Sequence, residues 1–284
     1  MKVLFVYRNP LMGFSIGKVF KPIEDFLGNY AEVDSIVLPI ANYSLKGLLI
    51  NILHLRKQLK KESYDAVLIT GTENYLLPFI PFAKKIVVVH DLESFIKNSS
   101  GLRKVFKKLM FIKVLRKADK IVSISEHTHQ ELLAYDFHSD VIYDPVSPKF
   151  IHVKKVINKV CPVILHIGTK PNKNLKNTII ALLKEYNRCD IVNFPSLYEG
   201  FGMPIIVGQA TGRVVVTSNL SPMKDVAGGC AVLVDPNDIQ SLRQGYFEAI
   251  NHGECYIVKG LENVKRFSVE TIARQYFNLI KNLL

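Results

Sequence analysis

Short apolar runs alternate along the chain with longer segments in which apolar residues recur at helical spacing. In the first half, the runs that predict buried strands are residues 3–7, 66–70, 85–90, 120–125 and 141–143. A second set comprises residues 163–167, 191–194, 214–217 and 231–234. Strands that alternate with helices form parallel sheets covered by helices. The pattern therefore predicts an α/β fold made of two Rossmann-like domains.

The two sets of strands are separated by a segment that lacks clear periodicity. An Asp-Pro and a Ser-Pro pair begin this segment, residues 144–160, and the remainder is basic. Such pairs favour turns over regular elements. We therefore place the hinge here and expect an N-terminal domain at 1–150 and a C-terminal domain at 151–266. Residues 267–284 follow as a helix, because Ser268 is a typical cap before apolar residues at helical spacing.

Length and composition are those of a globular two-domain protein. The chain has 284 residues, of which 48% are hydrophobic, yet no apolar run approaches the ~18 residues of a membrane-spanning helix. The first ten residues, MKVLFVYRNP, reach charged positions too soon for a signal peptide and predict a core strand. We therefore expect a cytoplasmic protein.

The four cysteines lack the spacing of a metal site. Cys161, Cys189, Cys230 and Cys255 are scattered without a C-x-x-C pair, and three of them lie in or beside apolar runs. The pattern predicts buried thiols and no zinc site.

The chain has a net charge of +12, and residues 102–117, from Leu102 to Lys117, contribute seven basic residues and no acidic one. One interpretation is an interfacial helix that contacts an anionic membrane surface. The alternative, given equal weight, is a helix packed on the core with a solvated basic face. Nucleic-acid binding is disfavoured, because basic residues without a known binding module are weak evidence.

Residues 194–218, FPSLYEGFGMPIIVGQATGRVVVTS, contain the clearest candidate site. Pro204 suits the first position of a helix, and Gly212 suits the residue just past its end. Gly200 and Gly202 allow the backbone to approach a ligand closely. Free N–H groups at the helix start favour a phosphate, so the segment predicts a site for a sugar phosphate.

Glu199 lies beside these glycines, and the whole segment resembles the second-domain motif of the retaining glycosyltransferases called group 1 or family 4. These enzymes have the two-domain GT-B architecture. The resemblance continues through residues 221–238 and includes residues 163–175 and 117–133.

In this family an E-x7-E pattern binds the donor. The resemblance implies that Glu199 contacts the donor sugar as a catalytic residue. It also implies that the diphosphate is bound by the turn and helix start, namely Gly200, Phe201, Gly202, Met203 and Pro204. The second glutamate, which contacts the nucleotide ribose, is replaced by Val207. Because Val207 lies about one helical turn after Pro204, we expect it to border the same cleft.

Two further donor-binding residues follow the strand at 163–167. The resemblance implies that Gly168 ends this strand and that Lys173 binds the diphosphate, while Thr169 replaces a frequent arginine and Lys170 is a possible substitute. Without the resemblance, the sequence alone would predict an exposed lysine in a loop at Lys173. Asp225 is a weaker acidic candidate.

In the first half, His90 ends a strand at the carboxyl edge of the predicted sheet, where open parallel sheets bind ligands. The family has a His-Asp pair near the donor sugar at a similar place, so the resemblance implies a catalytic role. The alternative is a half-buried histidine that caps the following turn. Gly13 and Gly17 could form a glycine loop that faces the donor phosphates and acceptor, although the spacing is a weak signal. Helix capping alone explains Ser125.

The resemblance implies transfer of a sugar, with retention, from a nucleotide-diphosphate sugar to a glycan or lipid-linked acceptor. No cofactor is expected, and no Asp-x-Asp motif is present to hold a metal. The expected location is cytoplasmic, and the interfacial interpretation of residues 102–117 would place the protein peripherally on the inner face of the membrane.

Two other function classes remain open. Val207, Thr169 and the space for only one crossover helix between residues 167 and 191 favour a catalytically impaired nucleotide-sugar-binding homologue. This spacing predicts a short second sheet, because family members have additional units here. A basic nucleic-acid-binding protein is the second alternative.

Overall fold

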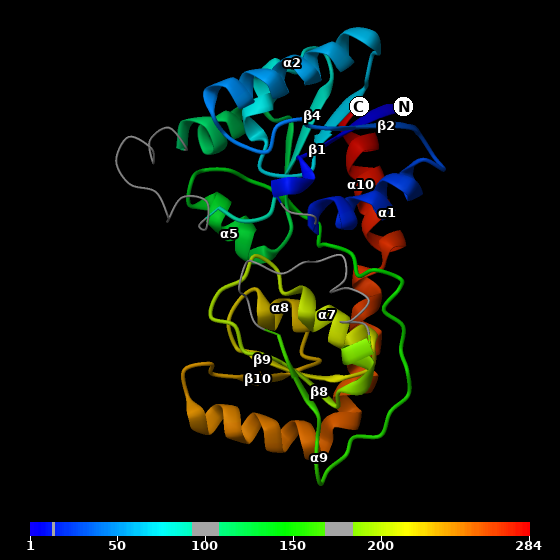
Figure 1. The fold of residues 1–284 in the computed structure, drawn as a ribbon, viewed down its shortest axis with the longest axis vertical. Coiled ribbons are helices and arrows are strands. Elements are labelled where there is room, and N and C mark those ends of the chain that lie inside the picture. The colour runs from blue at the N-terminus through cyan, green and yellow to red at the C-terminus, as the bar shows by residue number, and fades with distance from the viewer. Residues whose placement is uncertain (13–14, 93–107, 168–183) are drawn as a thin grey trace. The chain divides into compact units, whose positions relative to one another are not determined.

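The chain folds into two compact units (Figure 1). The computed structural model describes residues 1–12, 15–92, 108–167 and 184–284. Unit 1 comprises Met1–Tyr143 and Ile272–Leu284, and unit 2 comprises Asp144–Thr271. Each unit has its own parallel sheet with helices packed on it. The predicted α/β fold with two Rossmann-like parts is confirmed.

The sheet of unit 1 has the strand order β2-β1-β3-β4-β5-β6, and all its neighbours are parallel. Its strands are β1 (Lys2–Tyr7), β2 (Glu32–Val37), β3 (Ala66–Ile69), β4 (Lys84–Val89), β5 (Lys120–Ser123) and β6 (Asp140–Val141). All five strands predicted for this half are present. The apolar pattern misses β2, because this edge strand has the mixed sequence EVDSIV and is only partly buried.

Helices cover this sheet and link its strands. They are α1 (Ser15–Leu27), α2 (Leu45–Lys61) and α5 (Glu126–Leu133), with short helical turns η1 (Pro10–Met12), η2 (Asn74–Phe79), η3 (Lys108–Ile112) and η4 (Lys113–Lys117). Leu48 and Leu55 of α2 join the core cluster that contains Val67 and Val87 of the sheet. The Ser125 hydroxyl accepts a hydrogen bond from the Thr128 N–H at 3.1 Å, which confirms Ser125 as the cap of α5.

The C-terminal helix α10 (Val269–Leu283) begins after Ser268, whose hydroxyl accepts from the Thr271 N–H at 3.1 Å. From Ile272 onward it belongs to unit 1. Its Tyr276 ring meets the buried Phe20 ring of α1 edge to face, with centroids 5.8 Å apart. The predicted helix that crosses back to the first half is therefore confirmed.

The sheet of unit 2 has the order β10-β9-β8-β7, all parallel. Its strands are β7 (Ile164–His166), β8 (Ile191–Phe194), β9 (Val214–Ser218) and β10 (Val232–Val234), and its helices are α7 (Met203–Ala210), α8 (Met223–Ala227), α9 (Ile239–Asn263) and the turn η5 (Val264–Phe267). β7 pairs directly with β8, so the described part of this sheet is as short as the sequence predicts.

The long helix α9 lies very close to this small sheet. A Cβ atom added to Gly245 would meet Val234 Cγ1 at 2.4 Å, and one added to Gly253 would meet Val214 Cγ2 at 2.6 Å. No side chain larger than hydrogen fits at either position without displacing a strand residue. The two glycines thus allow α9 to cover the core of valines at close range.

Residues 144–163 form no helix or strand, in agreement with the loop predicted there. Arg213, which is 2% exposed, attaches this segment to unit 2. Its guanidinium donates to the carbonyl oxygens of Tyr186 (2.9 Å), Gly212 (3.0 Å), Val153 (2.9 Å) and Asn187 (3.0 Å). Lys155 adds an ion pair to the buried Asp190 at 2.8 Å. The buried Arg213 guanidinium therefore connects the linker to residues 186–187, before β8, and to the turn that follows α7.

The basic segment 102–117 is described only from Lys108 onward. Here it is helical, as predicted, but in the form of η3, a π-helical turn, and η4, a 3-10 turn. The Phe111 carbonyl accepts a hydrogen bond from the Asn74 side chain at 2.8 Å, which joins η3 to η2. Phe111, Ile112 and Leu115 are buried, as expected for the core-packed alternative.

Side-chain burial corrects one prediction on the cysteines. Cys189 is buried, but Cys161 and Cys255 are exposed and Cys230 is intermediate. Cys161 is exposed because it precedes Pro162 in the irregular linker and lies outside β7.

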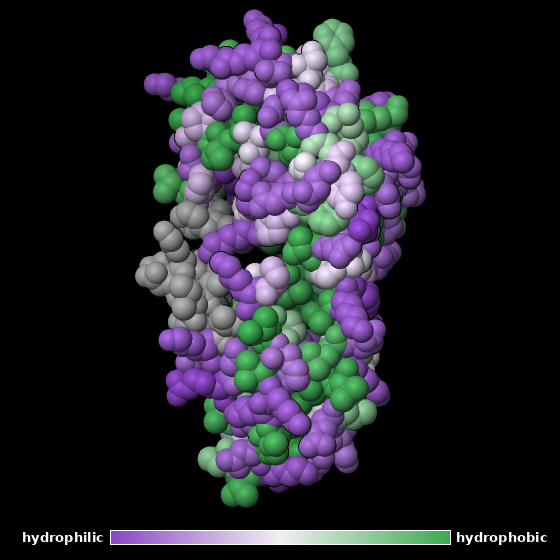
Figure 2. Space-filling model, turned by 90° about the vertical axis from the view of Figure 1, so that its right-hand side faces the viewer, coloured by the Kyte–Doolittle hydropathy of each residue, from purple (hydrophilic) through white to green (hydrophobic). Residues whose placement is uncertain are grey.

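Hydrophilic side chains cover much of the face shown in Figure 2. Among the described residues, no helix is long and apolar enough to cross a membrane.

Candidate functional site

The turn between β8 and α7 has the backbone that its sequence predicts. Gly202 precedes the helix in a left-handed conformation with φ of 113°, and Gly212 follows it with φ of 69°. Pro204 lies in the first turn, and the N-cap residue Gly202 has no side chain that could cap this helix start. The predicted bounds of this short helix are therefore confirmed. Its uncapped start provides the partial positive charge that favours an anion.

Glu199 lies in this turn as a half-buried residue. The Ser196 hydroxyl donates a hydrogen bond to Glu199 Oε1 at 3.0 Å. Phe201 is 4% exposed, and its ring packs against Phe267 with centroids 5.8 Å apart. The buried ring and the serine together fix the turn on either side of the carboxylate.

Two hydroxyl groups at the end of β9 attach the same turn to the sheet. The Thr217 hydroxyl donates to the Phe194 carbonyl at 2.9 Å, and the Ser218 hydroxyl donates to the Ser196 carbonyl at 2.5 Å. Sequence reasoning does not assign these residues. The signal available is the polar Thr-Ser pair that ends the apolar run at 214–216.

Val207 lies on α7 and is only 4% exposed. The adjacent Gly208 faces the sheet, because an added Cβ there would meet Val215 at 2.8 Å and Val192 at 3.2 Å. The border position predicted for Val207 remains a prediction. Its burial means that a charged side chain there would need a partner, since an unpaired buried charge is unfavourable.

Several predicted donor-binding residues, Gly13, Gly168 and Lys173, lie outside the described residues, as does Thr169. Gly17 is described and lies exposed in the first turn of α1. A Cβ added to it would meet nothing within 4 Å, so its neighbours in the protein do not require glycine. It lines a cavity of about 350 Å³ together with Arg8 and Lys18, among others.

His90 directly follows β4, at the carboxyl edge of the unit 1 sheet. Its Nε2 lies 2.9 Å from the Thr70 carbonyl oxygen, so in the neutral ring this nitrogen is the N–H donor and Nδ1 is an acceptor. The Thr128 hydroxyl donates to the His90 carbonyl at 3.3 Å. The ring is thus held by the backbone directly after β3, an arrangement compatible with the predicted catalytic role and with a structural one.

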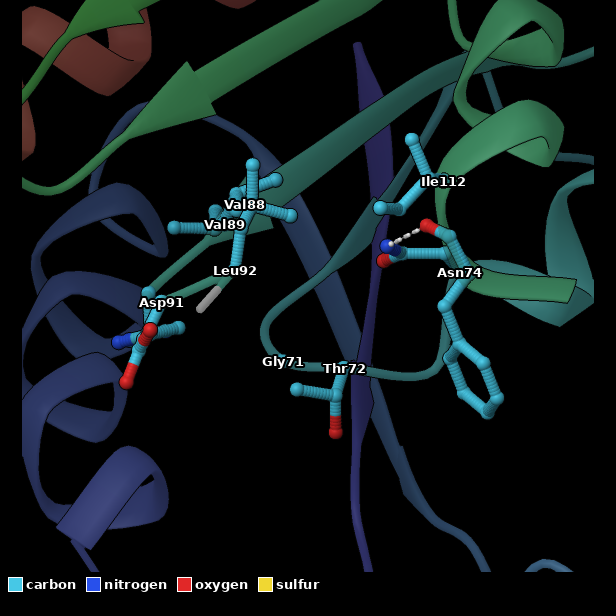
Figure 3. Close-up of a pocket in the computed structure, with 10 residues that line it drawn as sticks. Gly71, Thr72, Asn74, Val88, Val89, Asp91, Leu92 and Ile112 are labelled. Atoms are coloured by element: carbon cyan, nitrogen blue, oxygen red, sulfur yellow. Dashed lines mark hydrogen bonds between the residues drawn. The ribbon is translucent and has the colours of Figure 1, made fainter. Parts of the chain in front are cut away.

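A small pocket adjoins His90, and Figure 3 shows its lining. Thr72 and Asp91 lie on the two loops at its mouth, and Asn74 reaches across to the segment before Ile112. Its volume of about 20 Å³ has room for little more than one water molecule. This pocket alone does not accommodate a sugar.

Glu73 is a buried acid that sequence reasoning misses, because residues 70–75, TGTENY, predict a loop. It is 2% exposed, and burial raises its pKa from 4.5 to about 7, although nearby Arg8 opposes this shift. Neither carboxylate oxygen forms a hydrogen bond of good geometry within the described part of the chain. The carboxyl lies next to Gly71, where an added Cβ would be 2.8 Å from Glu73 Oε2.

Glu73 should make stability depend on pH. The folded state keeps a proton that the unfolded state loses between pH 4.5 and about 7, so the free energy of unfolding should fall as pH rises through this window. The loss is at most about 3 kcal/mol. We expect Glu73→Gln to remove this dependence in urea unfolding at pH 5 and pH 8. The exposed Glu126→Gln is the control, and a pH profile unchanged in Glu73→Gln would contradict the assignment.

Each unit is a parallel sheet covered by helices, and unit 2 has a glycine turn and a helix start at the carboxyl end of a strand. These features are those of the GT-B fold of glycosyltransferases. Comparison with known proteins agrees. Residues 162–252 match the family model described as "Glycosyl transferases group 1", and residues 20–150 match "Glycosyltransferase Family 4". The chain belongs to the GT-B glycosyltransferases of these groups.

Solved structures show the same fold over the whole chain. A sucrose-phosphate synthase from Thermosynechococcus elongatus aligns with a TM-score of 0.77 at 14% identity, covering 100% of this chain and 99% of that one. Anabaena Alr3699/HepE, in complex with UDP and glucose, aligns with a TM-score of 0.70 at 14% identity, covering 99% and 100%.

Among curated proteins, the O-antigen chain mannosyltransferase B of Escherichia coli is 33% identical over 93 residues. The match covers 32% of this chain and 24% of that protein. The chain thus spans about a quarter of this relative's length.

Proposed function

We propose that the protein transfers a sugar from a nucleotide-diphosphate sugar to a glycan or lipid-linked acceptor, with retention and without a metal ion. The observation that carries this proposal is the half-buried Glu199, held by Ser196 in the glycine turn before the uncapped start of α7. In this proposal Glu199 contacts the donor sugar, and the turn of Gly200 to Pro204 holds the diphosphate.

Cleavage of the bond between sugar and diphosphate builds negative charge on the leaving group. Catalysis therefore needs N–H dipoles or cations directed at that charge. The start of α7 supplies dipoles, and in our proposal Lys173 supplies a cation after Gly168. His90, with Nδ1 as an acceptor, would bind a hydroxyl group near the reacting sugar.

The names of similar proteins suggest donors for a first test. The Escherichia coli relative is a mannosyltransferase, and the Anabaena structure contains UDP and glucose. We propose a hexose donor and suggest GDP-mannose and UDP-glucose as probes. We also propose a cytoplasmic location on the inner face of the membrane, with residues 102–117 contributing to contact with anionic lipid.

Calorimetric titration of UDP and GDP, with and without the sugar, combined with an assay of donor hydrolysis and transfer, tests the function. We expect tighter binding of one nucleoside diphosphate than of its nucleoside, together with turnover of the matching donor. Binding without turnover would favour the second candidate, a catalytically impaired binding homologue, which Val207 and the short second sheet favour. Salt-sensitive binding of nucleic acid that nucleotide sugars do not compete would instead support the third class.

Restoring the absent glutamate should strengthen nucleotide binding. Val207→Glu is expected to raise affinity for a ribonucleoside diphosphate about tenfold, because a carboxylate can accept charge-assisted hydrogen bonds from both ribose hydroxyls. The 2′-deoxy analogue should gain little. Because position 207 is 4% exposed, the free variant should melt lower than the parent, and the nucleotide should recover this loss.

Val207→Gln is the matched control for this substitution, since a glutamine side chain has nearly the same shape as a glutamate side chain but no charge. Equal affinities for the ribo- and deoxyribonucleotide in a folded Val207→Glu variant would mean that position 207 does not face the ribose.

A further inference from the structure

The outward face of α2 exposes a row of leucines. Leu45, Leu49 and Leu53 are 77%, 55% and 56% exposed, and their spacing of four residues places them one above another on the same helical face. The opposite face of α2 packs Leu48 and Leu55 into the core. Among the described residues of unit 1, none covers more than about half of any of the three outward leucines.

The same helix carries positive charge and no acidic residue. Its sequence, LKGLLINILHLRKQLKK, has exposed basic side chains at Lys46, Arg56, Lys57, Lys60 and Lys61. None of these five forms an ion pair with another residue in the described part of the chain. We call the three leucines and these five basic residues the α2 surface.

The chain just before α2 contacts the described part of the basic segment. Tyr43, just before the helix, meets Phe111 of η3 edge to face with centroids 5.1 Å apart. Beyond this contact, Leu109 is 47% exposed, and Lys113 and Arg116 are exposed as well. Apolar and basic side chains are thus exposed on η3 and η4 as well as on α2.

We propose that the α2 surface docks on an anionic lipid bilayer, with the leucines at the boundary between headgroups and acyl chains and the basic side chains at the phosphates. An amphipathic basic helix binds such an interface through apolar area and attraction to anionic lipids together. A free phosphate would not require the leucines, and a second copy would place like charges against each other. The proposal deepens the membrane contact proposed above, and it does not depend on donor binding.

Co-sedimentation with phosphatidylcholine vesicles, with and without phosphatidylglycerol, tests the proposal. The parent protein should bind only the anionic vesicles, more strongly at low salt. The triple variant Leu45→Ser, Leu49→Ser, Leu53→Ser should lose about tenfold or more in vesicle binding. The triple variant Lys57→Gln, Lys60→Gln, Lys61→Gln should lose the dependence on anionic lipid.

Three exposed apolar residues of α9 supply the matched control. Ile239, Phe247 and Val258 are 79%, 54% and 71% exposed, and their replacement by serine should leave vesicle binding unchanged. Melting temperature and titration of UDP and GDP show that each variant is folded, and they test the donor site separately.

Three results would overturn the proposal. The first is a leucine variant that binds the vesicles as tightly as the parent does. The second is a parent protein that is indifferent to lipid charge. The third is a parent dimer that the leucine substitutions convert to monomer in sedimentation experiments without any effect on vesicle binding, which would assign the leucines to a contact between copies.

Discussion

Glu199→Gln should reduce turnover of the sugar donor by about 100-fold or more, which corresponds to roughly 3 kcal/mol of transition-state stabilisation. The glutamine has nearly the same shape but no charge to stabilise the positive charge that develops on the sugar as its bond to the diphosphate breaks. Affinity for the nucleoside diphosphate alone should stay within about twofold, because that ligand lacks the sugar.

Two controls make this measurement specific. Ser196→Ala removes only the 3.0 Å hydrogen bond that positions the carboxylate, so its loss of turnover should be smaller. Glu185→Gln changes an exposed glutamate of unit 2 and should have no effect. If Glu199→Gln transfers the sugar as fast as the parent, Glu199 does not contact the donor in the transition state.

Arg213→Met should lower the free energy of unfolding by about 3 kcal/mol or more. The substitution fills similar space but removes the donor of four carbonyl oxygens, from Val153, Tyr186, Asn187 and Gly212, and the bonds to Tyr186 and Gly212 are buried. Urea unfolding followed by circular dichroism measures the change. Arg213→Lys should recover only a part of it, because an ammonium group cannot reach the same four acceptors with planar geometry.

Arg188→Met is the matched control for Arg213. The Arg188 side chain is 75% exposed, and within the described residues its ion pair is with Glu185 at 3.3 Å, so its loss should cost less than about 0.5 kcal/mol. Similar unfolding midpoints for the two variants would show that the linker is held by other contacts.

Local sequence signals are sufficient to predict the helix of the candidate site and most strands. Pro204 and Gly212 bound α7 because their backbone preferences act within a few residues. Continuous apolar runs predict the buried strands for the same reason, since each run needs cover on both faces. β2 escapes this signal because an edge strand tolerates charged residues such as Glu32 and Asp34.

The parts that the sequence does not predict depend on residues far apart in the chain. Ser218 meets Ser196, and Arg213 meets Val153, only because strands and linker are brought together by folding. Glu73 is buried by the packing of its surroundings, which no local pattern around it reveals. For Cys161 the local pattern predicts burial, because an apolar run follows it, yet the side chain is exposed, because the residue belongs to the linker and not to the sheet.

The return of α10 to unit 1 has a consequence for synthesis on the ribosome. Phe20 of α1 is fully buried in the finished fold and contacts Tyr276, yet all of unit 2 is translated between these two residues. At roughly 5–20 residues per second, this interval lasts tens of seconds. During that time α1 lacks the Tyr276 ring that packs on Phe20 in the finished fold, so unit 1 is completed only after unit 2 has been synthesised.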